Sequence, residues 1–501
     1  MKRIISLLLL VAMVFSFAAC AGETVKDNNS KDTTAGNADT TAGNAGTTIA
    51  YEEDDLPADL NFGGEKVTIL TIEDSLHDGE ITTEELNSDI INDSVYNRER
   101  FVEDRLGVEI ETISVDAYED VNTEFDKMIN ADDDTYQICA TKTVWFAPYV
   151  FDSVLTDLYT VEHLDLEKPW WSQYFNEQAE VKGDLYLTTG SLSLSLTRFL
   201  FAMFYNKNLA EEYSSTYPEL TDIYTIVENG DWTYDKFYSI AADIYENVNG
   251  DNERDAEDTY GIGYQAGIGI DALWSSFDVN IFSRTDDGWF ELDVNTDKLY
   301  NALEKIRVLL HDTTGCYVPE NKEDDALNDL SAKFADGGLL FMVNKIHAAE
   351  GATLRNMQDE YGLIPYPKYD DNQKEYYSFA HDQYFSFSIP KTNRNPDMAG
   401  AVLEAMASYS YRDTHPSYLN VALKGKYMND PQSRRMVDLI ISGFKLDPSW
   451  IYCHKTGGFG SEYRSRIRDN DQSYAQEYAS LDKKFKIVLK LLDKEFNPED
   501  N

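Results

Sequence analysis

Side chains that commonly do catalysis are abundant in this chain, but their spacing matches none of the familiar catalytic motifs. The seven histidines form no His-Glu-x-x-His pair, and no Gly-x-Ser-x-Gly or Gly-x-x-x-x-Gly-Lys-Ser/Thr segment is present. Among 90 acidic residues, carboxylate pairs at glycosidase spacing arise by chance and have no diagnostic value. The glycines of 261–267 miss the dinucleotide-binding spacing by one residue. We therefore expect no enzyme active site and no organic cofactor.

One acidic loop, residues 249–258, carries oxygen atoms at alternating positions, as calcium-binding loops do. It lacks the glycine and the closing glutamate of an EF-hand. A calcium site and a solvated acidic turn are both compatible with this pattern, and the turn is favoured. The candidate ligands are Asn249, Asp251, Glu253, Asp255 and Asp258.

The seven tryptophans fall mostly beside turns and polar clusters rather than inside apolar runs. Aromatic faces in a polar cleft suit sugars, because the C–H faces of a sugar stack on the ring while its hydroxyls bond to polar side chains. A tryptophan taken alone is more often part of a core. Core packing is therefore favoured for each tryptophan by itself, with stacking on a sugar as the alternative, and Trp170 and Trp171 are expected to pack.

The first twenty residues have the pattern of a secretory signal. Lys2 and Arg3 precede an apolar run over 4–17, and the run ends at Ala18-Ala19-Cys20. This pattern resembles bacterial lipoprotein signals, with Phe17 in place of the usual leucine. We predict a signal peptide over 1–19 and lipidation of Cys20, which would anchor the chain to the outer face of the cell membrane. An ordinary signal with an incidental cysteine is the alternative.

The stretch that follows has almost no large apolar residue and cannot form a core. It repeats a seven-residue unit, first at 32–38 and again at 39–45. Such a repeat without paired apolar positions is typical of a flexible spacer. We predict a lipidated tether over 20–59 and a folded domain that begins near Leu60.

The composition of the remainder is that of a large globular domain. The apolar share of 42% and the aromatic share of 13% are enough for a core divided over two or three lobes. The formal charge of −47 excludes a nucleic-acid partner. Cys139, Cys316 and Cys453 are too few for a disulfide scaffold or a metal knuckle, and a bond between the last two stays open. We expect a monomer.

The order of elements predicts an α/β fold. A buried strand over 66–72 is followed by apolar residues at helical spacing over 91–106 and by a second strand over 108–113. The parallel strands of such a unit gather their loops at their carboxyl ends, where ligands bind. Further along, helical stripes cover 299–310 and 474–492. The last helix is expected to pack on its own domain rather than form a coiled coil.

An ordered set of short segments connects the chain to a known family. The segments cover residues 67–72, 134–141, 183–186, 204–209, 230–237, 334–341 and 361–368. Together with the signal, they resemble the extracellular solute-binding proteins of bacterial ABC importers, specifically the carbohydrate-binding group (family 1) that includes maltose-binding protein.

The resemblance implies a two-lobed periplasmic-binding-protein-like fold of type II, in which each lobe is a mainly parallel sheet flanked by helices. It places 60–190 and 338–390 in lobe 1, and 191–337 and 391–501 in lobe 2. It further implies a binding protein, not an enzyme, that holds a sugar or oligosaccharide between the lobes and delivers it to separate permease subunits. A surface glycoside hydrolase or another carbohydrate-active lipoprotein is the alternative.

Ligand-binding residues are carried over from the family position by position, chiefly onto loops at strand ends and onto the crossings between lobes. The residues so implied are Glu73, Asp74, Thr141, Lys142, Trp145, Arg198, Trp274, His381, Asp382 and Trp450.

Overall fold

The computed structural model describes residues 51–320, 325–423 and 431–496. The predicted signal peptide, Cys20 and the repeats of the predicted tether lie outside the described residues. Everything below concerns the compact unit Tyr51–Asn501.

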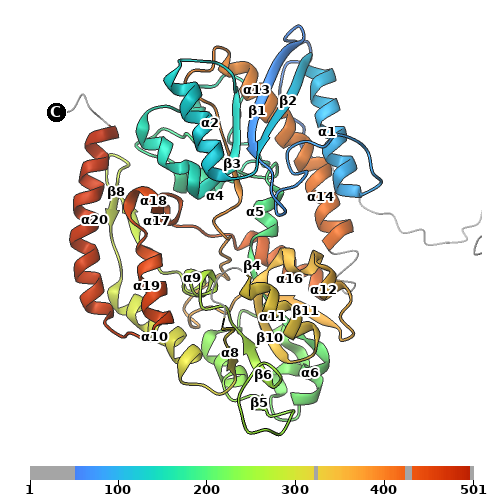
Figure 1. The fold of residues 1–501 in the computed structure, drawn as a ribbon, viewed down its shortest axis with the longest axis vertical. Coiled ribbons are helices and arrows are strands. Elements are labelled where there is room, and N and C mark those ends of the chain that lie inside the picture. The colour runs from blue at the N-terminus through green and yellow to red at the C-terminus, as the bar shows by residue number, and fades with distance from the viewer. Residues whose placement is uncertain (1–50, 321–324, 424–430, 497–501) are drawn as a thin grey trace, which may run out of the picture. The chain divides into compact units, whose positions relative to one another are not determined.

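The first sheet has the strand order β12-β3-β1-β2. β1 runs parallel to both β2 and β3, and β12 is antiparallel to β3. Helices α1, α2 and α13 lie around this sheet at the top of Figure 1. The strands and helices are β1 (Glu65–Ile72), α1 (Ile90–Leu106), β2 (Val108–Val115), α2 (Tyr118–Asn130), β3 (Ile138–Lys142), β12 (Phe385–Ser388) and α13 (Pro396–Tyr409).

Local signals explain why α1 begins and ends where it does. The Asp89 carboxylate accepts the backbone N–H groups of Ile91 and Asn92, which have no partner within the helix. Gly107 ends the helix in the left-handed conformation with φ 60°, which glycine adopts without strain. The predicted strand, helix and strand over 66–113 are confirmed.

The second sheet is mixed, with the order β11-β4-β10-β6-β5 and β9 paired to β6. β10 is parallel to β6 and antiparallel to β4. Helices α6, α8, α11 and α16 lie around it in the lower part of Figure 1. Its elements are β4 (Phe201–Asn206), α6 (Lys207–Tyr213), α7 (Ile223–Glu228), α8 (Tyr234–Ala241), β5 (Tyr245–Glu246), β6 (Thr259–Gly263), α9 (Ile268–Ser276), β9 (Cys316–Tyr317), α11 (Ala326–Ala335), β10 (Leu339–Lys345), α12 (Ala352–Arg355), β11 (Tyr361–Ile364) and α16 (Pro431–Ser442).

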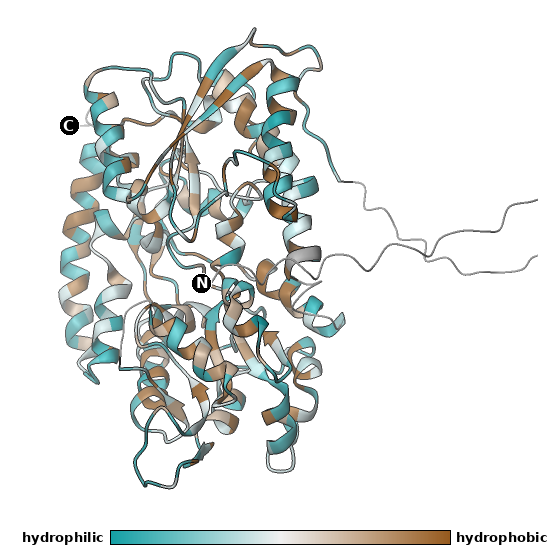
Figure 2. Ribbon diagram, turned by 45° about the vertical axis from the view of Figure 1, so that its right-hand side comes forward, coloured by the Kyte–Doolittle hydropathy of each residue, from teal (hydrophilic) through white to brown (hydrophobic). Residues whose placement is uncertain are grey.

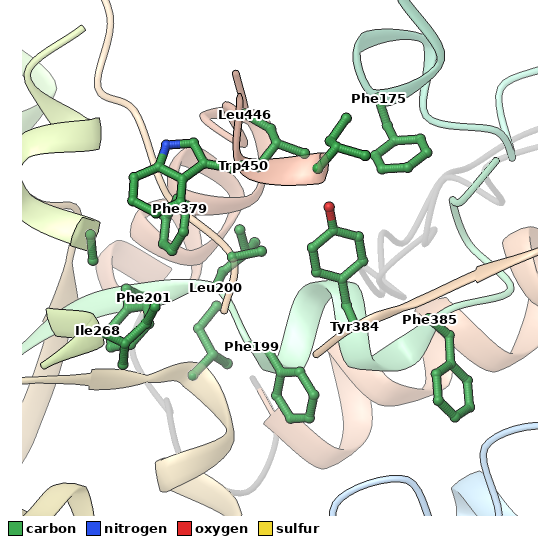
Figure 3. Close-up of a cluster of buried hydrophobic side chains, with 14 of the residues drawn as sticks. Phe175, Phe199, Leu200, Phe201, Ile268, Phe379, Tyr384, Phe385, Leu446 and Trp450 are labelled. Carbon is green, nitrogen blue, oxygen red and sulfur yellow. The ribbon is translucent and has the colours of Figure 1, made fainter. Parts of the chain in front are cut away.

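The chain crosses between the two sheets through α5 (Leu194–Arg198) and again between β11 and β12. The crossings meet at an antiparallel bridge between Leu200 and Ala380, and a third stretch joins them at Ser378 and Phe444. An aromatic and aliphatic cluster fills this junction. Figure 3 labels its members as Phe175, Phe199, Leu200, Phe201, Ile268, Phe379, Tyr384, Phe385, Leu446 and Trp450.

Further helices and a hairpin complete the fold, and the C-terminal helices run along one side of it in Figure 1. The long outer helices alternate teal and brown in Figure 2, the pattern of helices buried on one side. The elements are α3 (Thr143–Phe146), α4 (Gln173–Ala179), β7 (Phe282–Arg284), β8 (Phe290–Leu292), α10 (Thr296–His311), α14 (His415–Ser417), α17 (Pro448–Ile451), α18 (Cys453–Thr456), α19 (Phe459–Arg468) and α20 (Tyr474–Phe496).

The C-terminal helix packs on its own domain, as the sequence predicts. Leu481, Phe485 and Leu489 are buried on one side of α20. The Trp289 indole donates to the Leu489 carbonyl at 3.2 Å, and the Phe496 ring lies 5.9 Å from the Trp289 ring. Among the described residues, none of the helices combines the length and apolarity that crossing a membrane requires.

The predicted lobe 1 is wrong for part of 338–390. β10 and β11 pair with β4 and β6 in the second sheet, so they belong with the second lobe. Pairing between strands that are distant in the sequence decides which lobe a strand joins. The local sequence pattern does not indicate this pairing. Only β12 of that range joins the first sheet.

The predicted lobe 2 is likewise wrong for the start of 391–501. Asn393 donates to the Gln137 carbonyl at 3.0 Å, and Arg98 of α1 donates to the Ser410 hydroxyl at 2.8 Å. α13 packs against α1 beside the first sheet. This section therefore belongs with the first lobe.

The folded body begins before Leu60. Lys168 pairs with Glu52 at 2.7 Å and with Asp55 at 2.5 Å, and Asp54 pairs with Arg105. The last part of the predicted tether, 51–59, is thus attached to the domain through ion pairs. Cys139, Cys316 and Cys453 are all free thiols, so the disulfide left open between the last two is not formed.

Candidate functional site

Polar side chains from both lobes meet beside the crossing segments, in a region that we call the interlobe site. The contributing loops follow the carboxyl ends of β1, β3 and β10, where ligands of parallel sheets bind. The crossing at α5, the stretch before β12 and helix α19 complete it. The interlobe site consists of Asp74, His77, Lys142, Trp145, Arg198, Asp271, Lys345, His347, Glu350, His381, Asp382 and Arg464.

On the side of the first lobe, Asp74 organises the loop after β1. Its carboxylate pairs with Lys142 at 2.8 Å and lies 2.8 Å from Nδ1 of His77. Nε2 of His77 faces the Gln383 carbonyl at 2.9 Å, so both ring nitrogens meet acceptors. The His77 ring also stacks on Phe385, with centroids 4.4 Å apart.

Asp74 is held in its charged form. Partial burial opposes ionisation, but the hydrogen bonds from His77 and Lys142 outweigh it and keep the pKa of Asp74 well below its usual range. An ionised Asp74 in turn fixes the Lys142 ammonium at the end of β3. This gives the site a paired cation and anion on one wall.

Arg198 links the crossing segment to both lobes. Its guanidinium donates to both Glu350 oxygens, at 3.1 and 3.0 Å, and to the Leu76 carbonyl at 3.0 Å. Tyr418 donates to Glu350 at 2.8 Å. The fork geometry of arginine suits such a bidentate pair. Arg198 therefore lies at the interlobe site, where Glu350 already engages its forked donor set.

His347 and His381 of the interlobe site are neutral. Burial, with Arg198 and Lys345 nearby, lowers the pKa of His347 to about 4. Burial and the neighbouring cations, Lys345 first, hold the pKa of His381 well below its usual range. A neutral imidazole offers one donor and one acceptor, which suits a hydroxyl.

Arg464 of α19 faces Asp271 of α9. Nε of Arg464 lies 2.7 Å from the Asp271 carboxylate, which is fully buried, while about a quarter of the Arg464 side chain is exposed. Burial raises the pKa of Asp271 despite this partner. The exposed part of Arg464 is therefore the cation that this pair presents to the site.

Trp145 lies where the two lobes meet. Its half-buried ring stacks on Tyr118 at 4.0 Å and meets the edge of His454 of α18 at 4.0 Å. Tyr118 belongs to the first lobe and His454 to the C-terminal helices. Trp145 is thus the predicted tryptophan that the structure brings to the site.

The other two predicted tryptophans are packed in the core, and the prediction that they contact a ligand is wrong for this structure. Trp274 is fully buried, and Trp450 is 9% exposed. Their rings lie 5.6 Å apart, and Phe379 meets Trp450 at 5.2 Å (Figure 3). Gly460 lies so close that a side chain there would strike the Trp450 ring. Neither ring has a face available for a sugar.

The remaining predicted residues divide between the site and its surroundings. Thr141 is buried, and its hydroxyl has no hydrogen-bond partner among the described residues. His381 and Asp382 lie together, 3.5 Å apart, in the stretch before β12. Glu73 is exposed at the end of β1.

Sequence reasoning missed His77, Asp271, Lys345, His347, Glu350 and Arg464. Two signals could have found some of them. Lys345 ends a fully buried strand, His347 follows it, and His77 is in the same turn as the predicted Asp74. Arg464 belongs to an amphipathic helix and gave no local signal.

The structure places three of the five predicted calcium ligands together and engages Asp258 elsewhere in the loop. Asp258 is buried, and it accepts hydrogen bonds from Tyr245 at 2.8 Å and from the Val248 and Asp255 backbone at 3.2 and 3.3 Å. It holds the loop in place from inside. Asn249 donates to Asp251 at 3.0 Å. The carboxylates that lie within 4.8 Å of one another are those of Asp251, Glu253 and Asp255.

Solved structures share this architecture. The galacto-N-biose/lacto-N-biose I-binding protein of an ABC transporter from Bifidobacterium longum matches with a TM-score of 0.56 at 12% identity, over 86% of this chain and 98% of that one. A cyclo/maltodextrin-binding protein matches with a TM-score of 0.52 at 12% identity, over 87% and 98%. An ABC-transporter solute-binding protein from Thermotoga lettingae gives 0.50 at 12%, over 87% and 100%.

This chain has the two-lobed type II fold of ABC solute-binding proteins. The fold class and the family likeness predicted from sequence are confirmed at the level of the fold. No family model and no curated protein sequence matches the chain. The three neighbours are binding proteins whose structures contain lacto-N-biose, maltotetraose and α-D-tagatose.

Proposed function

We propose that this protein is the extracytoplasmic substrate-binding component of an ABC importer and that it takes up a sugar or oligosaccharide between its lobes. In this proposal the lipidated Cys20 anchors it to the outer face of the membrane, and separate permease subunits receive the ligand. The protein binds and releases its ligand without chemical change.

The observation that carries the proposal is that residues of both lobes and of the crossing between them contribute to the interlobe site. Asp74 and Lys142 come from strand ends of the first lobe, His347 from a strand end of the second, and Arg198 from the crossing between them. A ligand touching all four bridges both lobes. Such a ligand stabilises the closed arrangement by the difference between its affinities for the closed and open forms.

The charges of the site favour a neutral ligand rich in hydroxyl groups. The site contains four cationic and four acidic side chains, and three of each are paired with one another: Lys142 with Asp74, Arg198 with Glu350 and Arg464 with Asp271. A net anionic or cationic ligand would meet no excess of opposite charge, whereas hydroxyls can bond to both partners. The cations are Lys142, Arg198, Lys345 and Arg464, and the carboxylates are Asp74, Asp271, Glu350 and Asp382.

The decisive experiment is a glycan panel on the purified mature chain, read by thermal shift, by calorimetry and by assay of new reducing ends. The proposal expects a thermal shift and binding heat for at least one saccharide and no reducing ends. Release of reducing ends would favour the glycosidase alternative. Binding of peptides or amino acids alone would contradict the carbohydrate assignment.

Asp74→Asn links that binding to the interlobe site. The substitution removes the charge that holds Lys142 and His77, so affinity is expected to fall about 10-fold or more. Asp286→Asn, in the exposed turn between β7 and β8, is the matched control and should bind normally. Equal affinity in both variants would contradict the assignment of the site.

A further inference from the structure

A cavity with a volume of about 960 Å³ lies beside the crossing segments, apart from the interlobe site. Its walls come from α4, from the stretch between α9 and α10, from residues 375–377 and from the end of α16 through Asp447. None of the residues of the interlobe site lines it. Cavities of about 300–1,000 Å³ hold small-molecule ligands in proteins.

The aromatic cluster at the junction of the lobes forms a wall between the two sites. The Tyr384 ring lies 6.1 Å from Phe175, whose neighbour Tyr174 lines the cavity. On its other side are Phe199 and Phe385, which contact His77 of the interlobe site (Figure 3). The cavity is therefore a separate compartment rather than an extension of the first.

Two lysines and four carboxylates line the cavity, and both lysines have Asp278 as an acidic partner. Lys445 pairs with Asp278, and its ammonium lies 4.3 Å from the centre of the Tyr377 ring. Lys298 donates to the Asp278 carbonyl at 2.8 Å. The Asp447 carboxylate accepts backbone N–H groups at 2.9 and 3.2 Å and is buried. An anionic ligand would find no free cation here.

Uncharged polar groups remain available. The side-chain amides of Gln178 and Asn280 have no hydrogen-bond partner among the described residues. Each amide offers two donors and an acceptor, the set that vicinal hydroxyls need. Tyr174 and Phe444, with rings 6.2 Å apart, add aromatic surface beside them. Amides next to aromatic rings are the chemistry of a saccharide site.

We propose that this cavity is a second saccharide-binding site, which binds a neutral saccharide independently of the interlobe site. The ligand class rests on the proposed function, but the location does not. One face of this ligand would contact the ring of Tyr174 while its hydroxyls bond to Gln178 and Asn280. Because α4 belongs to the first lobe and the stretch 278–298 to the second, the occupant would touch both.

The test uses crystals of the mature chain soaked in maltotriose, lacto-N-biose and glucose, and calorimetry with the same sugars. The double variant Gln178→Ala/Asn280→Ala removes the free amides, and Asp74→Asn disturbs only the interlobe site. Ser442→Trp, at the exposed rim, is a second variant that fills the cavity instead. We expect saccharide density in both sites of the native protein. The double variant and Ser442→Trp should each weaken the second binding event about 10-fold or more while leaving the first in place.

Three results would overturn the proposal, and they differ in what they mean for the proposed function. Density and affinity that respond only to Asp74→Asn would leave a single interlobe site and preserve the proposed function. Binding that responds only to the cavity variants would make the cavity the primary site and contradict the interlobe assignment. Absence of all three sugars from the cavity, when the glycan panel identifies a saccharide that binds, would overturn the second site and preserve the proposed function.

Discussion

Replacing Trp145 with alanine separates ligand binding from folding at the interlobe site. The ring is half-buried, with one face on Tyr118 and an edge contact to His454, each at 4.0 Å. It thus lies at the meeting point of the lobes without being enclosed. The substitution removes a large aromatic surface from the site and leaves the lobes themselves intact.

The expected magnitudes follow from these contacts. A central aromatic residue of a binding site is worth about 1–3 kcal/mol when truncated, or roughly 5- to 150-fold in Kd. The two ring contacts contribute about 0.5–1.5 kcal/mol each to folding. Trp145→Ala should therefore weaken saccharide binding clearly and lower Tm only modestly.

Trp232 provides the matched control. Its ring is fully buried in the second lobe, and its indole donates to the Pro365 carbonyl at 3.1 Å. Trp232→Ala should cost about 3–5 kcal/mol of stability. Its folded fraction should keep native affinity, because the ring lies away from the interlobe site.

The assay is calorimetry with a saccharide identified by the glycan panel, combined with urea unfolding of both variants. Unchanged affinity in Trp145→Ala would refute the reasoning, since the ring would then be only a packing element. A loss of stability in Trp145→Ala as large as that in Trp232→Ala would also show that the Trp145 ring is a packing element.

Three further outcomes are expected. Cys20→Ser should move the protein from the membrane fraction to the soluble fraction without altering affinity, and retention in the membrane would contradict the anchor. Burial raises the pKa of Glu404 to about 7, so between about 4.5 and 7 the folded state keeps a proton that the unfolded chain has lost. The free energy of unfolding should therefore fall by about 3 kcal/mol as pH rises through that window, and Glu404→Gln should abolish this slope in urea unfolding. EDTA should leave Tm unchanged, because Asp258 is already engaged inside the 249–258 loop, and a drop reversed by calcium would show a metal site.

Closing of the lobes is measurable by small-angle scattering. A saturating saccharide should reduce the radius of gyration, because a ligand that bridges both lobes favours the closed form. A confirmed ligand that leaves the radius unchanged would exclude lobe closure as the mechanism of capture.

Elements governed by local patterns were predictable from the sequence. A buried apolar run, apolar residues at helical spacing and a terminal glycine predicted β1, α1 and the start of β2, and Gly107 has the left-handed φ that its position requires. The apolar spacing of 474–492 predicted α20 and its packing side. These features depend on neighbours within a few turns, which a sequence displays directly.

Partition between the lobes was not predictable in this way. β10 joins β4 and β6 through pairings that span the second lobe, and α13 returns to α1 across most of the chain. The energy that selects these partners comes from long-range burial and strand pairing. A single sequence does not display these long-range contacts. Several divisions of the chain between the two lobes are therefore equally consistent with its local pattern.

The candidate site shows the same division. The family resemblance in the sequence implied that Asp74, Lys142 and Trp145 lie near the carboxyl ends of the first strands, and the structure places them at the ends of β1 and β3 and in α3. Only the tertiary structure decided that His77 meets the Gln383 carbonyl, 306 residues away, and that Trp274 is core. Whether an aromatic ring is buried or open depends on which distant segments pack over it, and that is a property of the whole fold.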